Sequence, residues 1–251
     1  MTRIVVIGDV GGCADHLTRA LEPLIGTPDT VVIQVGDLID RGPDSPGVLR
    51  LVSRRLAATA PRWIQLIGNH ESPYLGAEPF WPEPLDDADA ALLRHWWLTE
   101  RLRVAAAIRT AEGEEFLLTH AGLTVAAWRE LGEPVTASTA ADLLNTRPET
   151  LLWSYGGPLW AEPAQVYGSW LDERLTMPFS QAHGHSAVVD YQHRSWVCEE
   201  RIRVRSTADW DARRTVTRLT GGCFVAVDPK HGRMGADSWA PWVLDDAAII
   251  S

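Results

Sequence analysis

Cysteine is scarce in this chain of 251 residues, which carries only Cys13, Cys198 and Cys223. The three lie far apart in the sequence, so they form neither a disulfide framework nor a paired zinc-binding motif, and we expect reduced thiols in or near the core. No stretch approaches the roughly 20 apolar residues that a membrane helix needs, and no basic region followed by an apolar signal segment opens the sequence. We therefore expect a cytoplasmic protein with no membrane partner.

Clustered positive charge is also lacking. The formal net charge is -10, Lys230 is the sole lysine, and no run of Lys or Arg is long enough to follow a nucleic-acid backbone, which excludes sequence-independent binding to nucleic acid. An acidic protein repels an anionic substrate unless bound cations reverse the local field. A phosphate ester as substrate would therefore favour a metal site.

Apolar runs rich in β-branched residues alternate with helical patterns along the first third of the chain. Such runs, bounded by Gly, Asn and Asp, predict buried strands. They cover residues 3–7, 30–35, 63–67, 104–108, 115–119 and 222–227, and helical patterns cover residues 16–24 and 46–60. Alternating strands and helices favour an α/β layered fold with functional loops at the carboxyl ends of the strands.

The length favours a single domain spanning residues 1–251, with two Trp- and Pro-rich inserts at about 72–102 and 132–180. Each insert has two interpretations, either a surface loop with aromatic anchors on the core or a substrate-facing wall or lid. Residues 194–220 alternate Arg with apolar residues, which favours a solvated strand over a basic binding patch.

Polar side chains follow the predicted strands at the point where each strand ends. Asp9, Asp37, the pair Asn69 and His70, and His120 all come directly after an apolar run. One such junction is usually a turn, but four in succession indicate one site built across a sheet edge. Carboxylate, amide and imidazole ligands together suit Mn, Fe, Zn or similar divalent ions.

The motifs at these junctions resemble those of the calcineurin-like metallophosphoesterases, especially the phosphoprotein phosphatase branch, which includes serine/threonine phosphatases and diadenosine tetraphosphatases. Their order and spacing both match over roughly residues 3 to 190. The motifs read "GDVGG" at 8–12, "GDLIDRG" at 36–42, "GNHE" at 68–71, "HAG" at 120–122 and "GHS" at 184–186. The resemblance implies a metallo-dependent phosphatase fold, which is a two-sheet β-sandwich flanked by helices with the active site at the carboxyl ends of strands.

The resemblance also implies a pair of divalent metal ions, with Mn favoured and Fe, Zn or Ni also suited. Asp37 would bridge the two ions and Asp9 would bind the first. The second would be bound by Asn69, His120 and a histidine of the "HGH" segment at 183–185. Such a pair holds a hydroxide for in-line attack on phosphorus and neutralises the charge of the phosphate.

Three further residues acquire catalytic or substrate-binding roles from the same resemblance. His70 would protonate the leaving oxygen, and Asp40 would orient it. Arg41 would grip the non-bridging phosphate oxygens as a fork, with Asn69 also facing the substrate. The alternative for Asp40 and Arg41 is a surface ion pair in a turn.

Gly11 departs from the family pattern, which has a histidine ligand of the first metal at this position. If "GHS" matches the family's Gly-His, His185 binds the second metal and His183 is spare or only supports a ligand. If His183 and His185 match the superfamily's His-x-His, His183 binds the second metal and His185 replaces the missing imidazole. Water is a third candidate. The remaining histidines that we considered are expected at exposed or helix-surface positions; they are His16, His95, His193 and His231.

The leading functional prediction is a dinuclear metal-dependent phosphatase that cleaves a phosphomonoester on phosphorylated Ser/Thr or on a small molecule. A diadenosine tetraphosphate hydrolase is an alternative, in which Trp81, Trp96 and Trp97 would stack on adenine if they do not simply pack. A catalytically impaired, metal-binding regulatory protein is a second alternative, supported by Gly11 alone. The sequence specifies neither the physiological substrate nor the oligomeric state.

Overall fold

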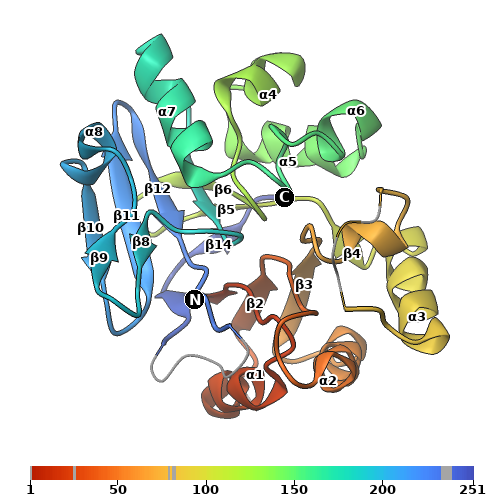
Figure 1. The fold of residues 1–251 in the computed structure, drawn as a ribbon. Helices are drawn as coiled ribbons and strands as arrows, with labels where there is room; N and C mark the ends of the chain where they lie inside the picture. Colours follow the sequence, from red (N-terminus) through yellow and green to blue (C-terminus); the bar gives the residue numbers. More distant parts are fainter. Residues whose placement is uncertain (1, 25–26, 79, 81–82, 233–238) are drawn as a thin grey trace.

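The computed structural model describes residues 2–24, 27–78, 80, 83–232 and 239–251, and two mixed sheets dominate these residues (Figure 1). The first sheet runs in the order β13 (Trp242–Leu244), β1 (Arg3–Ile7), β2 (Thr30–Gln34), β3 (Arg62–Leu66) and β4 (Leu102–Arg103). The second runs in the order β10 (Ser206–Asp209), β11 (Arg214–Leu219), β12 (Gly222–Ala226), β7 (Ser180–His183), β6 (Glu115–Thr119), β5 (Ala106–Arg109) and β14 (Ala248–Ile249). Strands β8 (Val189–Asp190) and β9 (Ser195–Trp196) form a separate hairpin.

Helices lie on the outer sides of the two sheets. Figure 1 shows α1 and α2 beside β2 and β3, and α4 to α7 grouped on the opposite side of the molecule. The helices are α1 (Ala14–Leu21), α2 (Ser45–Ala57), α3 (Asp87–Leu98), α4 (Val125–Glu130), α5 (Ala137–Asn145), α6 (Glu149–Leu152), α7 (Pro163–Glu173) and α8 (Glu200–Arg203), with 3-10 turns η1 (Glu22–Leu24) and η2 (Ser72–Tyr74). This arrangement confirms the predicted α/β fold of two sheets flanked by helices.

Both faces of strand β1 are buried, because successive side chains of a strand point to opposite faces. Ile4 and Val6 pack between the two sheets against residues such as Leu118 of β6. Val5 and Ile7 point the other way, into a second cluster that includes residues of α1 and α2. Fully burying each such side chain contributes about 1.5–3 kcal/mol. The continuous apolar runs of the sequence are therefore explained by strands covered on both sides.

All six apolar runs form strands whose ends shift by at most two residues, but the inserts contain more helix than their composition suggested. Thr136 begins α5 by accepting a hydrogen bond from the N–H of Thr139 at 3.2 Å, which is an N-cap interaction. Pro163 begins α7 at a position where its missing N–H costs nothing. The strand predicted over residues 194–220 is wrong around Arg201, which lies on α8 and pairs with Asp172 of α7.

The cysteines, the helix lengths and His231 each bear on a prediction from the sequence. All three cysteines are free, with Cys13 and Cys223 buried and Cys198 partly buried, as expected for reduced thiols near the core. No helix in the described ranges is both long and apolar enough to cross a membrane. His231, expected on the surface, is instead buried, because its ring packs against those of His16 and Trp239.

Parallel pairing brings the functional loops to one edge. Strands β1, β2 and β3 run parallel in the first sheet, and β6, β7 and β12 run parallel in the second. Gln34, fully buried at the end of β2, ties two of these loops together. Its amide nitrogen donates to the carbonyls of Gly8 at 3.1 Å and Gly36 at 2.7 Å, while its amide oxygen accepts from the N–H of Gly36. The loops after β1 and β2 are therefore held at a fixed separation.

Candidate metal centre

Four residues of the candidate site have backbone conformations that side chains normally avoid. Asp37 has a φ of 54°, Asp40 of 69°, Arg41 of 64° and His185 of 61°. A residue other than glycine held in this left-handed region costs of order 1–3 kcal/mol, and such strain gathers at functional sites. The loops after β2 and β7 therefore hold these side chains in the candidate site in strained backbone conformations that lower local stability.

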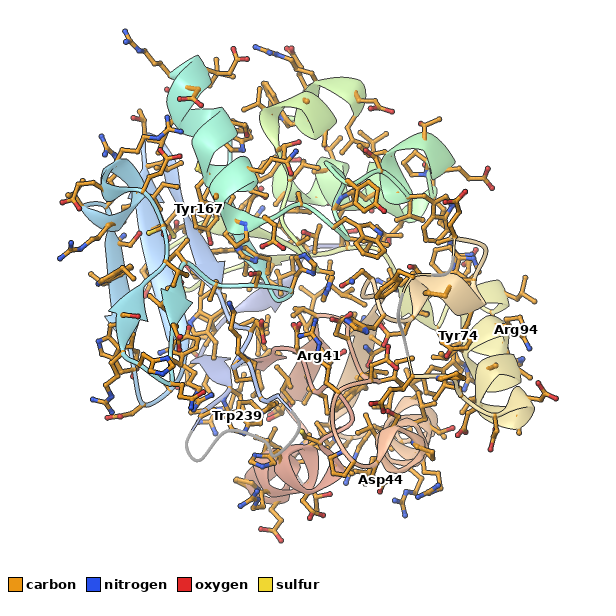
Figure 2. The ribbon with its side chains drawn as sticks, viewed as in Figure 1. Arg41, Asp44, Tyr74, Arg94, Tyr167 and Trp239 are labelled. Atoms are coloured by element: carbon orange, nitrogen blue, oxygen red, sulfur yellow. The ribbon has the colours of Figure 1, made fainter. Side chains whose placement is uncertain are left out.

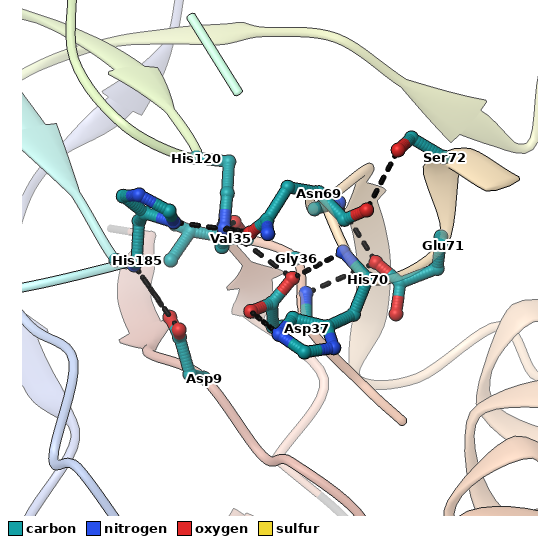
Figure 3. Close-up of polar contacts among 12 residues, drawn as sticks. Asp9, Val35, Gly36, Asp37, Asn69, His70, Glu71, Ser72, His120 and His185 are labelled. Atoms are coloured by element: carbon teal, nitrogen blue, oxygen red, sulfur yellow. Dashed lines mark hydrogen bonds and ion pairs between the residues drawn. The ribbon is translucent and has the colours of Figure 1, made fainter. Parts of the chain in front are cut away.

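Asp37, His120 and His185 bring ligand atoms within 4.8 Å of one another, a spacing that a single metal ion can bridge. The side-chain oxygen of Asn69 completes the group, at 2.9 Å from Nε2 of His120 and 3.0 Å from Nδ1 of His185 (Figure 3). These four side chains come from the loops after β2, β3, β6 and β7. The structure thus brings together the residues that the resemblance assigns to the second metal when His185 is the histidine of "GHS".

The hydrogen bonds of His120 suit a cation at this position. Nδ1 of His120 lies 2.9 Å from the carbonyl oxygen of Val35, which accepts its proton. Burial lowers the pKa of His120, so the ring is neutral and Nε2 presents a lone pair. That lone pair faces the amide oxygen of Asn69, which is also an acceptor. Two acceptors directed at each other are the arrangement expected of two ligands of one metal ion.

Asp9 lies beside this group and is held by the backbone. The N–H of His185 donates to both carboxylate oxygens of Asp9, at 2.9 and 3.1 Å. A Cβ at Gly184 would lie 2.1 Å from Oδ1 of Asp9, so only glycine permits this approach. Burial raises the pKa of Asp9 well above its usual value, and the nearby carboxylates of Asp228 and Asp37 raise it further. Asp9 thus lies in a surplus of negative charge that a cation would relieve.

His70, Asp40 and Arg41 form a contiguous group next to Asp37. Nδ1 of His70 lies 2.5 Å from Oδ2 of Asp40, and Nη2 of Arg41 donates to Nε2 of His70 at 3.1 Å. Figure 2 labels Arg41 near the centre of the molecule. Asp40 is buried and bonds the imidazole, so it does not form the surface ion pair considered as its alternative. Burial lowers the pKa of His70, but Asp37 and Asp40 raise it more, and the net shift is upward.

Glu71, the last letter of "GNHE", was not assigned a role from the sequence, yet it holds two site loops together. It is fully buried. Its Oε2 accepts the N–H groups of Asp37 at 3.0 Å and Gly68 at 2.8 Å, and its Oε1 accepts that of Leu38 at 2.8 Å (Figure 3). Burial, with a contribution from Asp37, raises its pKa to about 7. The intact "GNHE" motif at 68–71 was the sequence signal that could have identified Glu71 as a site residue.

His183 does not face the other candidate ligands with a free nitrogen. It is fully buried, its Nδ1 lies 2.8 Å from the carbonyl oxygen of Gly184, and its Nε2 accepts from the hydroxyl of Tyr167 at 2.7 Å. Burial lowers its pKa to about 4, so the ring is neutral. Both ring nitrogens are engaged by other groups, which favours the alignment in which His185 faces the metal and His183 is spare.

Asp228 is a further carboxylate beside Asp9 that the sequence analysis missed. It follows strand β12 as Asp9 follows β1, and only 1% of it is exposed. It lines a narrow hollow together with Asp9, Asp37 and Gly11. The recurrence of a buried strand ending in an acidic residue, "FVAVD", was the signal available in the sequence.

Aromatic side chains extend outward from His70. The ring of Phe80 contacts that of His70 edge-on at 5.1 Å, and Trp160 contacts Phe80 in the same way at 4.9 Å. Tyr155 lies 5.6 Å from Trp160 and is 80% exposed. The rings of Phe80, Trp160 and Tyr155, which we call the aromatic row, come from both Trp- and Pro-rich inserts.

The tryptophans considered earlier for adenine stacking lie elsewhere. Trp96 is 1% exposed and belongs to the core. Trp97 packs beneath the guanidinium of Arg147, whose central carbon lies 3.6 Å from the ring centroid. Both therefore pack, as the alternative interpretation held. Trp81 lies outside the described residues.

Comparison with known proteins agrees with this geometry. A family model described as calcineurin-like phosphoesterase matches residues 2–201. The chain is 35% identical over 144 residues to a symmetrical bis(5'-nucleosyl)-tetraphosphatase of Dechloromonas aromatica, covering 51% of this chain and 48% of that protein. A protein of the same name from Delftia acidovorans is 31% identical over 163 residues, covering 60% of this chain and 55% of the relative. The chain therefore spans about half the length of the curated relatives it matches.

Solved structures share the fold at lower identity. A cold-active protein-tyrosine phosphatase of a psychrophilic Shewanella species superposes with a TM-score of 0.56 at 16% identity, covering 100% of this chain and 81% of that chain. A protein serine/threonine phosphatase from Saccharomyces cerevisiae gives a TM-score of 0.50 at 13% identity, with 97% and 79% covered. At such identities the likeness concerns the fold alone, which is the fold that the sequence motifs imply.

Proposed function

We propose, from the premise that this chain belongs to the calcineurin-like phosphoesterase family, that it is a hydrolase of phosphoric esters that requires two divalent metal ions. The observation that carries the proposal is the contact between two groups of side chains. The His70, Asp40 and Arg41 group adjoins the group of candidate metal ligands, with Nε2 of His70 lying 3.7 Å from Oδ2 of Asp37. A residue that only helped to hold a metal would not need the arginine and the buried aspartate that flank His70.

The residues present fit the metals that the family implies. Asp37, Asn69, His120 and His185 would hold the second ion, and Asp37 and Asp9 would contribute to the first, with Mn favoured by the mixed oxygen and nitrogen ligands. When bound, the ions would supply the hydroxide nucleophile and neutralise the charge of the phosphate.

Arg41 and His70 act on the substrate in this proposal. Without substrate, Arg41 donates to Nε2 of His70, so the imidazole keeps its proton at Nδ1, against Asp40. A phosphate group that takes the guanidinium as a bidentate partner releases Nε2. Nε2 then takes up a proton from solvent, which the neighbouring Asp37 and Asp40 favour because they raise the pKa of His70. The imidazolium delivers that proton to the leaving oxygen and returns to the neutral ring, while Asp40 fixes its orientation and balances its charge.

The test compares His70→Ala with the wild-type protein loaded with Mn²⁺, on phenyl phosphate and on p-nitrophenyl phosphate. Loss of a general acid costs about 10²- to 10⁴-fold in kcat. The loss should be larger for phenyl phosphate, because its leaving oxygen is the more basic and depends more on protonation. His193→Ala is the matched control, since that imidazole is exposed and pairs only with Asp190 in the described structure. Equal rates for His70→Ala and wild type on both substrates would refute the role of His70 as general acid. Absence of Mn²⁺-dependent hydrolysis of either ester by the wild type would refute the proposed function.

The expected substrate is a phosphomonoester on a phosphorylated Ser/Thr residue or on a small molecule, but one observation favours a second candidate. The aromatic row begins beside His70, the proposed proton donor to the leaving oxygen, and ends at the exposed Tyr155. Aromatic rings of this kind bind a nucleobase by stacking. The relatives named symmetrical bis(5'-nucleosyl)-tetraphosphatases make a dinucleoside tetraphosphate the candidate to test.

Product analysis separates the two substrates. Symmetrical cleavage of diadenosine tetraphosphate gives ADP alone, whereas a phosphomonoesterase releases phosphate from a phosphoserine peptide and leaves the dinucleotide intact. If the dinucleotide is the substrate, Tyr155→Ala should raise KM for it by several-fold without changing kcat on phenyl phosphate. Turnover of neither substrate by a protein that retains its metals would support the regulatory alternative.

A further inference from the structure

We propose that the carboxylate of Asp228 is a ligand of the first metal ion and takes the place of the imidazole that Gly11 lacks. The inference rests on the proposed function in one respect, since it assumes that two ions bind. It assigns a residue from the loop after β12 to a site otherwise built from the loops after β1 and β2.

The backbone fixes Asp228 beside Asp9. A Cβ at Gly8 would lie 1.9 Å from the carbonyl oxygen of Val227 and 3.1 Å from the backbone nitrogen of Asp228, so the two loops touch where Gly8 has no side chain. The N–H of Val227 donates to the carbonyl of His183 at 2.8 Å, which anchors the same loop to β7. The position of Asp228 therefore follows from close backbone packing.

The carboxylate of Asp228 is buried with one oxygen unpartnered. Oδ1 accepts the N–H of Lys230 at 2.7 Å, whereas Oδ2 makes no hydrogen bond in the described part of the chain. Leaving such a buried oxygen unpaired is costly, and native proteins rarely do so without a functional reason. Asp228 lines the same narrow hollow as Asp9 and Asp37, where a cation would meet all three carboxylates.

The charges around the hollow favour a divalent cation. Burial raises the pKa of Asp228 and of Asp9, and the neighbouring carboxylates raise both further, because like charges disfavour ionisation. Arg41, Lys230 and His231 also line the hollow. Arg41 already donates to His70. Lys230 is exposed and donates its backbone N–H to Asp228, while the charge of its ammonium lowers the pKa of Asp228. The ammonium of Lys230 is the competing occupant that an experiment must exclude.

Gly11 contributes the space and the turn that this arrangement needs. Its φ is 51°, and a Cβ there would lie 3.5 Å from the carbonyl oxygen of Asp40 and within 4 Å of no other non-adjacent residue in the described part of the chain. The N–H groups of Val10 and Gly11 both donate to the carbonyl of Asp37, at 2.9 and 2.8 Å, so the turn fixes the bridging residue through its backbone. An oxygen ligand in place of an imidazole shifts the first site toward Mn²⁺ or Mg²⁺ and away from Zn²⁺.

The test counts ions instead of measuring turnover. Metal-free protein is titrated with Mn²⁺ alone by equilibrium dialysis, and the coupling between the ions is followed by Mn²⁺ electron paramagnetic resonance. Wild type should bind two ions, with the resonance of a coupled pair. Asp228→Asn should bind one ion tightly, with the resonance of an isolated ion, and its first-site affinity should fall by more than the roughly 10- to 100-fold that loss of an outer supporting group costs.

Two variants serve as controls. Lys230→Gln keeps the backbone N–H that Asp228 accepts and should still bind two ions. Asp228→Glu keeps an ionisable carboxylate and should bind two ions with a weakened first site, which covers the case in which Asp228→Asn does not fold in EDTA. The inference would be overturned if Asp228→Asn bound two ions with unchanged affinity. It would also be overturned if the wild type bound one ion and Lys230→Gln bound two, because the ammonium of Lys230 would then occupy the site. Because ions are counted, an inactive protein with this binding pattern would contradict the proposed function and leave the inference standing.

Discussion

Replacement of Glu71 by Gln should loosen the two loops that carry Asp37 and Asn69. Glu71 accepts three backbone N–H groups, one at Oε1 and two at Oε2, and it is fully buried. An amide offers a single acceptor oxygen. If that oxygen takes the place of Oε2, it keeps the N–H groups of Asp37 and Gly68, and the N–H of Leu38 then faces an amide nitrogen. The variant therefore leaves one buried donor unpaired.

One unpaired buried donor costs about 1–3 kcal/mol. The free energy of unfolding of Glu71→Gln, measured with urea in excess EDTA, should fall by that amount relative to wild type. Glu78→Gln, at an exposed position a few residues along the chain, is the matched control and should stay within about 0.5 kcal/mol of wild type. A change below about 0.5 kcal/mol in Glu71→Gln as well would show that Glu71 does not hold the loops together.

Three other outcomes follow from the geometry of the site. Tyr167→Phe removes the hydroxyl that donates to Nε2 of His183 and should lower stability by about 1–3 kcal/mol with the Mn²⁺ count unchanged. A lost ion would return His183 to the ligand set. Gly11→Ala should lower the free energy of unfolding in urea by about 1–2 kcal/mol, because its backbone is left-handed. Gly12→Ala should lower it more, because its Cβ would also lie 2.9 Å from the carbonyl oxygen of Gly42. Equal losses in the two variants would contradict this reasoning. Removal of metal with EDTA should lower the Tm of the wild type more than that of His185→Ala, which lacks one proposed ligand. Equal shifts of Tm, measured by calorimetry, would exclude His185 as a metal ligand.

The convergence of Asp9, Asp37, Asn69 and His120 could be predicted from the sequence, because each follows an apolar run and the carboxyl ends of parallel strands meet at one edge. Asp228 could not be singled out in the same way. It also follows a strand, but a single Asp-Pro after a strand is typical of an ordinary turn. Its place beside Asp9 depends on a backbone contact at Gly8 between segments more than 200 residues apart.

The choice between His183 and His185 depended on three-dimensional structure for a similar reason. Two histidines separated by one residue are equivalent by local pattern, and the left-handed backbone at His185 removes the simple alternation of an extended strand. The hydroxyl of Tyr167 on α7 engages His183, a partner from another element of the fold. The helical content of the second insert was obscured by its Gly, Pro and Trp residues, although Thr136 was available as a capping signal.

The most direct test of the central claim is a crystal structure of the Mn²⁺-loaded protein with diffraction measured at the manganese absorption edge. The account predicts two anomalous peaks that share Asp37. One peak should contact Asn69, His120 and His185, and the other should contact Asp9 and Asp228, beside Gly11. No peak next to Asp37 would contradict the metal-dependent hydrolase, whereas a single peak at the histidines would contradict the role of Asp228.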